Sequence, residues 1–222
     1  MMMNKDQKLL EEAYQSIYES SSEPTYFGSR DNKKMWLAWL AHKKHEVHAD
    51  GSITINDNVS LASRWLHVLP FNFRAVHGFF DCGQNQLKTL KGAPEFVEGT
   101  FACDYNDLES IKEAPKRVKG SFSVKGNRRL ESLEGCPEIV EGHFVCYGCR
   151  LHSLVGCPDI VKGDFDCRDN HFTSLDGAPE FVGGKFMSYP FADGEYRTFV
   201  KKRKYVDDKL DKDFDVDLGD FS

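Results

Sequence analysis

The chain of 222 residues is 40% hydrophobic and 29% charged, with a mean hydropathy of -0.51, and this composition excludes a wholly disordered or a membrane-spanning protein. Its formal net charge is -6, most of which comes from seven aspartates against two lysines in residues 207–222. Without an overall basic charge, nucleic acid is not an expected partner. We find no long apolar run and no secretory signal, so we expect no membrane contact and predict a cytoplasmic location.

Residues 1–22 predict an amphipathic helix followed by a linker. Apolar side chains recur at helical spacing over residues 5–19, from Leu10 to Ile17, and the polar run 20–24 ends the pattern. The helix folds back as a cap in one interpretation and serves as a detachable docking element in another.

Residues 23–58 predict a small α/β amino-terminal cap. The apolar run 35–41 indicates a short buried helix. Asp50 and Gly51, placed between the alternating residues of 47–55, are typical of a hairpin turn. The cap is therefore expected to consist of one helix and one hairpin.

Two residue types recur with a common period through the middle of the chain. Both series step by 21 residues except once, when they step by 22 in the coil that contains Arg128 and Arg129. The series are Pro94, Pro115, Pro137, Pro158 and Pro179, and Phe80, Phe101, Phe122, Phe144, Phe165 and Phe186. We predict that residues 59–189 form a mainly β repeat solenoid with one short parallel strand per coil, and that the extra residue forms a bulge.

Each coil is expected to use its residues in the same order. Phe101 and Cys103 lie two apart, so both point inward from a strand. Pro115 then ends regular hydrogen bonding, and Gly120 is expected to permit a tight bend into the next strand. The recurring Val-x-Gly-x-Phe stretches are accordingly interpreted as turns.

One polar position follows each inward cysteine position by three residues. We predict that its side chains form a structural ladder, which hydrogen-bonds backbone carbonyls where the chain bends inward. A thiol is a weak donor small enough for the same position. The ladder consists of Asn85, Asn106, Asn127, Cys149 and Asn170.

The segment Phe-x-Cys-x-x-Asn-x-Leu at residues 101–108 resembles the L-x-L-x-x-(N/C)-x-L segment of leucine-rich repeats. Ser-Leu-Val-Gly-Cys-Pro at 153–158 and Ser-Leu-Asp-Gly-Ala-Pro at 174–179 look like a 21-residue variant of that repeat. Proteins with this variant are similar to uncharacterised reading frames of bacteriophages and bacteria. The resemblance covers residues 59–189. It implies a horseshoe-like or straight solenoid with a recognition role, but it supplies no activity.

Both ends of the repeat depart from the pattern. Residues 59–69 predict a degenerate first coil, followed by Phe71 and Phe73 in place of small residues, as expected where a coil packs against a cap. Residues 190–222 predict a carboxy-terminal cap and an acidic tail. The tail is mobile in one interpretation; in another it is a linear motif that adds to a partner or to its own basic segment.

Seven cysteines raise the question of disulfides or zinc, and Cys146 and Cys149 have the C-x-x-C spacing. Their repeat positions explain them better, because small thiols serve as apolar filler at buried positions. His42, His45 and His48 are spaced by three, but the predicted hairpin sends His45 and His48 to opposite faces. We therefore predict no metal site, no cofactor and no catalytic residue.

The outward side of the strand ladder is the predicted binding face, because successive coils place variable side chains there about 4.8 Å apart. Several of these side chains are of the types enriched in interface hot spots. The alternative is that some merely coat a solvated sheet. The predicted face consists of Phe79, Tyr105, His143, Val145, Tyr147, Asp166, Arg168 and Tyr189.

Together these features predict a non-enzymatic protein–protein interaction module, encoded by a bacteriophage, that binds a host or viral protein in the host cytoplasm. One alternative is a minor structural subunit of the virion, held by its terminal arms. A metal-dependent or ligand-binding protein is a third hypothesis, supported only by the histidine cluster.

Overall fold

The computed structural model describes residues 8–9, 12 and 30–189. The predicted helix over residues 5–19 falls almost entirely outside the described residues. The predicted cap and tail over residues 190–222 fall wholly outside them.

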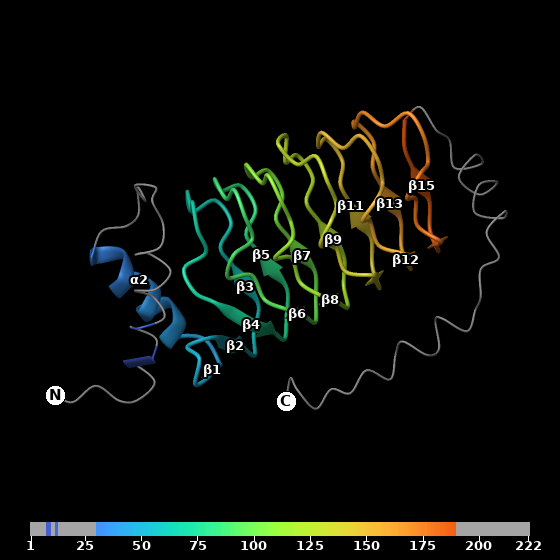
Figure 1. Ribbon diagram of the computed structural model, residues 1–222. Helices are drawn as coiled ribbons and strands as arrows, with labels where there is room; N and C mark the ends of the chain where they lie inside the picture. The colour runs from blue at the N-terminus through green and yellow to red at the C-terminus, as the bar shows by residue number, and fades with distance from the viewer. Residues whose placement is uncertain (1–7, 10–11, 13–29, 190–222) are drawn as a thin grey trace.

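The described chain winds into coils that stack along one axis, and two sheets run the length of the stack (Figure 1). Sheet A comprises β1 (His45–Val47), β2 (Ile53–Ile55), β4 (Phe73–Val76), β6 (Phe96–Val97), β8 (Arg117–Val118), β10 (Ile139–Val140), β12 (Ile160–Val161) and β14 (Phe181–Val182). Sheet B comprises β3 (Val59–Ser60), β5 (Phe80–Asp81), β7 (Phe101–Ala102), β9 (Phe122–Ser123), β11 (Phe144–Val145), β13 (Phe165–Asp166) and β15 (Phe186–Met187).

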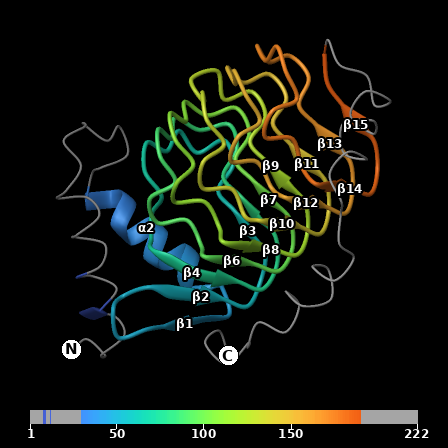
Figure 2. The ribbon, with the colours of Figure 1, turned by 45° about the vertical axis from the view of Figure 1, so that its right-hand side comes forward.

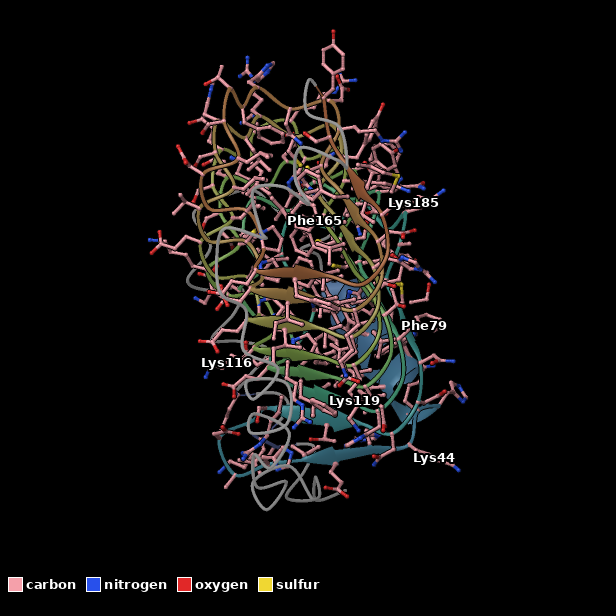
Figure 3. The ribbon with its side chains drawn as sticks, turned by 90° about the vertical axis from the view of Figure 1, so that its right-hand side faces the viewer. Lys44, Phe79, Lys116, Lys119, Phe165 and Lys185 are labelled. Atoms are coloured by element: carbon pink, nitrogen blue, oxygen red, sulfur yellow. The ribbon has the colours of Figure 1, made fainter. Side chains whose placement is uncertain are left out.

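The predicted mainly β repeat solenoid is confirmed. The parallel strand expected at the phenylalanine of each coil is the sheet B strand. Sheet A is an addition that the sequence analysis missed, because the Val-x-Gly stretches interpreted as turns contain a second parallel strand, as Phe96–Val97 and Arg117–Val118 show. The two sheets form adjoining walls of the coil, and an arc without strands closes it (Figures 2 and 3).

Stacked phenylalanine rings fill the interior behind sheet B. From Phe80 to Phe186, successive ring centroids lie 5.1–5.8 Å apart and successive ring planes meet at 6–28°. All six rings are buried. Because their spacing is close to the distance between adjacent strands, each ring packs on the same residue of the next coil.

Glycines at the corner between the two sheets allow neighbouring coils to approach closely. A Cβ atom on Gly99 would lie 2.9 Å from the carbonyl carbon of Gly78, and one on Gly163 would lie 2.7 Å from the carbonyl oxygen of Gly142. These glycines are not among those with positive φ. The expected bend at Gly120 therefore depends on close backbone packing and not on a left-handed conformation.

The recurring asparagines form hydrogen bonds across the coils. Asn106 donates from Nδ2 to the carbonyl oxygens of Cys82 (3.0 Å) and Cys103 (3.3 Å), and its Oδ1 accepts the N–H of Leu87 (3.0 Å). Asn85, Asn127 and Asn170 make the equivalent bonds in their own coils. Each amide thus links its own coil to the preceding one.

The 22-residue coil explains why a cysteine occupies one position of this column. The extra residue lies in the arc after Asn127, and the N–H of Leu130 bonds to the Asn127 carbonyl within the same coil (3.0 Å). The side chain at position 149 therefore does not have to accept the N–H of Leu130, and it only has to donate to a carbonyl of the preceding coil. Cys149 supplies the donor, since its Sγ donates to the carbonyl of Val124 (3.4 Å).

At the amino-terminal end, helix α2 (Arg30–Ala41) and the β1–β2 hairpin cover the first coil (Figure 1). Strand β2 also pairs with β4, so the hairpin and the solenoid share sheet A. Trp39 of α2 stacks on Phe71 at 6.3 Å, and Phe73 meets Phe80 edge-on at 5.1 Å. Aromatic contacts therefore continue from the helix into the phenylalanine stack.

We predict that Asn127→Ala lowers the free energy of unfolding by about 2–5 kcal/mol, because it leaves buried carbonyls and an N–H without partners. Cys149→Ala, the matched control, removes one weak donor and should cost about 1–2 kcal/mol. Urea titrations of both variants measure the difference. Equal losses would contradict the hydrogen-bonding role of the asparagine column.

Candidate functional site

Most of the predicted binding-face residues lie on the outer surface of sheet B or at its edges. In each coil the phenylalanine points inward and the residues on either side of it point outward. The residue after the inward cysteine position then reaches the surface at the end of the strand. This last column reads Asp104, Lys125, Tyr147, Arg168 and Tyr189.

Four residues of this column, together with Tyr105, which directly follows Asp104, form an alternation of cationic and aromatic side chains that we call the aromatic ridge. The ridge consists of Tyr105, Lys125, Tyr147, Arg168 and Tyr189. The exposed fractions of the three tyrosines are 52%, 37% and 76% in chain order. Lys125 Nζ lies 5.6 Å from the ring centroid of Tyr105. The guanidinium carbon of Arg168 lies 5.8 Å from the ring centroid of Tyr147. The ridge is therefore an exposed surface that is already organised by cation–π contacts.

Asp166 fixes the position of the Arg168 guanidinium. Arg168 Nε donates to Asp166 Oδ1 (2.9 Å) and Nη2 donates to Oδ2 (2.7 Å), which is a bidentate pairing. These hydrogen bonds raise the pKa of Arg168 further above its usual value. The cation is thus held beside Tyr147 while its side chain stays 52% exposed.

Tyr105 occupies a backbone position that favours glycine. Its φ is 52°, and the equivalent residues of the next two coils are Gly126 and Gly148. The Tyr105 ring lies where a side chain at Gly126 would be. A left-handed conformation at a non-glycine residue costs of order 1 kcal/mol, so the exposed tyrosine is kept at a cost to stability.

His143 belongs to a hydrogen-bonded column at the corner between the two sheets. Its Nδ1 accepts the N–H of Asp164 (2.9 Å), and its own N–H donates to Ser121 Oγ (3.0 Å). Asp164 Oδ1 in turn accepts the N–H of Lys185 (2.8 Å). The sequence analysis placed His143 on the binding face, and its side chain is 58% exposed. The bond from the Asp164 N–H gives the same imidazole a structural role as well. Val145 lies half-buried in the outward column of sheet B.

Among the described residues, two exposed aromatic side chains lie away from the ridge. Phe79 is 39% exposed and sits on the corner side of sheet B in an early coil, as Figure 3 shows. Phe79 lies beside β5 and is therefore several coils away from Tyr147 and Tyr189, which follow β11 and β15. Trp65 was missed by the sequence analysis although it is 65% exposed. Its only signal in the sequence is that an aromatic residue stands in the degenerate first coil at a position that is polar in the later coils.

Two of the three histidines considered as metal ligands form hydrogen bonds with neighbouring groups. His45 Nδ1 is 2.9 Å from the carbonyl oxygen of Lys43, and His48 Nε2 is 2.8 Å from Thr54 Oγ1. Within the described part of the chain, no three His, Cys, Asp or Glu side chains are grouped to hold a metal ion. All seven cysteines are free thiols, and the strand-position cysteines are fully buried.

No protein-family model, no curated protein and no solved structure matches this chain. The solenoid of about 21-residue coils is shown by the strand pairing of the structure itself, and the resemblances to leucine-rich repeats and to bacteriophage proteins remain predictions. None of the described helices is long and apolar enough to cross a membrane.

Burial makes the thiols sensitive to high pH. It raises the pKa of Cys149 from the ordinary thiol value of 9.0 to about 11, and that of Cys167 to about 12. Above pH 9 the unfolded chain loses these protons while the folded chain keeps them, so stability falls as pH rises toward 11–12.

We predict that each such thiol lowers the free energy of unfolding by about 1.4 kcal/mol at pH 10, relative to pH 8. Urea titrations at pH 8, 9 and 10 measure it, with Cys149→Ala/Cys167→Ala as the control. The double variant should show the shallower decline, because it lacks both titrating groups. Parallel declines in the two proteins would show that these thiols are not buried.

Proposed function

We propose that the protein is a non-enzymatic interaction module, encoded by a bacteriophage, that binds a host or viral protein through the aromatic ridge of sheet B. The observation that carries the proposal is the exposed pair of Tyr147 and Arg168, with the guanidinium pinned by Asp166. Tyrosine and arginine are the residue types most enriched, after tryptophan, among interface hot spots.

The rigidity of the ridge supports binding to a preformed partner surface. Each ridge residue projects from a coil whose backbone is hydrogen-bonded to a neighbouring coil, as in the bond from the Cys146 N–H to the Asp166 carbonyl (2.9 Å). Side chains that are ordered before binding lose less conformational entropy on association. The ridge should therefore act as a fixed template.

The mixed charge of the ridge favours a protein over a polyanion. Lys125 and Arg168 have Asp104 and Asp166 beside them, with Lys125 Nζ 3.5 Å from Asp104 and the Arg168 pair at 2.7 Å. A nucleic-acid surface requires a net excess of cations. Exposed tyrosines between paired charges are instead typical of protein interfaces.

We predict that Tyr147→Ala/Arg168→Ala abolishes partner capture without unfolding the protein. Tagged full-length protein expressed in the producing cells should recover a stoichiometric partner, measured by quantitative mass spectrometry. Loss of two hot-spot side chains should reduce recovery at least about ten-fold. The urea midpoint should not move measurably, since both side chains are exposed.

The matched control is Arg150→Ala/Val155→Ala, which removes a cation and an exposed apolar side chain from the arc without strands. It should capture the partner as the unmodified protein does. If the ridge variant retains full capture, the partner does not bind this face, and the assignment of the ridge is wrong.

A further inference from the structure

The outer face of sheet A carries a column of apolar side chains that point away from the core. Val97 and Val161 pack in the core, so their strand neighbours Phe96 and Ile160 point outward. Phe96 and Ile160 nevertheless expose only 3% and 1% of their surface. The strand register aligns the column, which one arginine interrupts, as Ala75, Phe96, Arg117, Ile139, Ile160 and Phe181.

Charged side chains flank this column, and their sign changes along the stack. Around β4 to β8 the charged residues are mainly basic: Arg74, Lys116, Arg117 and Lys119 against Glu95 and Glu98. Around β10 to β14 they are mainly acidic: Glu138, Glu141, Asp159 and Glu180 against Lys162. Figure 3 shows Lys116 and Lys119 at the sheet A wall, with Phe79 and Lys185 on the side of sheet B.

Polar side chains on this face also contact the apolar column. Lys119 Nζ lies 5.8 Å from the ring centroid of Phe96 and 3.4 Å from Glu98 Oε1. His77 lies 5.6 Å from the same ring, centroid to centroid. The basic end of the face is therefore an amphipathic surface, with an aromatic ring among charged groups.

The sequence after Tyr189 carries the complementary charges in the complementary order. Residues 201–204 are Lys-Lys-Arg-Lys, and residues 207–220 contain seven aspartates. Within the acidic stretch, residues 214–218 read Phe-Asp-Val-Asp-Leu. In an extended segment this alternation places Phe214, Val216 and Leu218 on one side.

We propose that residues 195–221 dock along the outer face of sheet A, running from β14 back toward β4. The basic run 201–204 then lies over the acidic end, and the acidic stretch lies over the basic end. The apolar side of 214–218 covers Phe96 and its neighbours in the column. The opposite direction would bring like charges together, which is unfavourable.

The length of this segment is sufficient. The six strands from β4 to β14 span five strand spacings, about 24 Å, which about eight extended residues cross. Residues 201–220 therefore reach from one end of the face to the other. Sheet A and the ridge lie on different walls, so the docked segment leaves the ridge accessible.

Photo-crosslinking tests this docking in the full-length chain. p-Benzoylphenylalanine replaces Ile139 on the outer face of sheet A or, as the control, Ser123 on sheet B. A mixture of light and isotopically heavy protein distinguishes crosslinks within a chain from crosslinks between chains. We expect crosslinks from position 139 to residues 195–221 of the same chain, at a yield at least about five-fold above that from position 123, because the two walls face different directions.

A charge exchange tests the direction of docking. Lys116→Glu/Lys119→Glu should lower the yield about three-fold or more, and adding Asp213→Lys/Asp215→Lys should restore it. Circular dichroism checks that each variant is folded. Crosslinks that are mainly intermolecular would identify a second copy as the occupant, and crosslinks equal from both positions would mean no docking; either result overturns the proposal.

Discussion

The close approach of successive coils at the glycine corner is the constraint on which the rest of the structure depends. A side chain at Gly99 or Gly163 would collide with the backbone of the preceding coil, so only glycine permits one strand spacing there. That spacing lets the phenylalanine rings stack at 5.1–5.8 Å. It also brings each asparagine amide within reach of carbonyls in two coils. Glycine, phenylalanine and asparagine thus act together in the repeats, with Cys149 in place of the asparagine in one coil.

The same spacing accounts for the surface chemistry. Outward side chains repeat at the strand separation, so residues far apart in sequence, such as Tyr147 and Arg168, meet as neighbours. On sheet B this produces the cation–aromatic ridge, and on sheet A it produces an apolar column with segregated charges. A solenoid can therefore carry two surfaces of different chemistry on adjoining walls without altering its core.

Much of the fold follows from the sequence because the phenylalanine and proline series share one period, which only stacked coils explain. Sheet A could not be predicted, since both residues of a strand such as Phe96–Val97 are apolar and buried, so its sequence shows no alternation between inward and outward positions. The exposure of Tyr147 and Tyr189 could be predicted, because both occupy the outward position after the inward cysteine position of their coils. The bonds of His143 to Ser121 and Asp164 do not, because they depend on which coils are neighbours.

Amide hydrogen exchange measured by NMR tests most directly whether the coils stack in this register. The N–H groups of Phe80, Phe101, Phe122, Phe144 and Phe165 each donate to a carbonyl of the following coil at 2.8–2.9 Å. We expect these buried amides to exchange slowly, with protection recurring every 21 residues and once after 22. Protection without this period, or phenylalanine amides that exchange as fast as in an unfolded chain, would contradict the stacked solenoid and both of its surfaces.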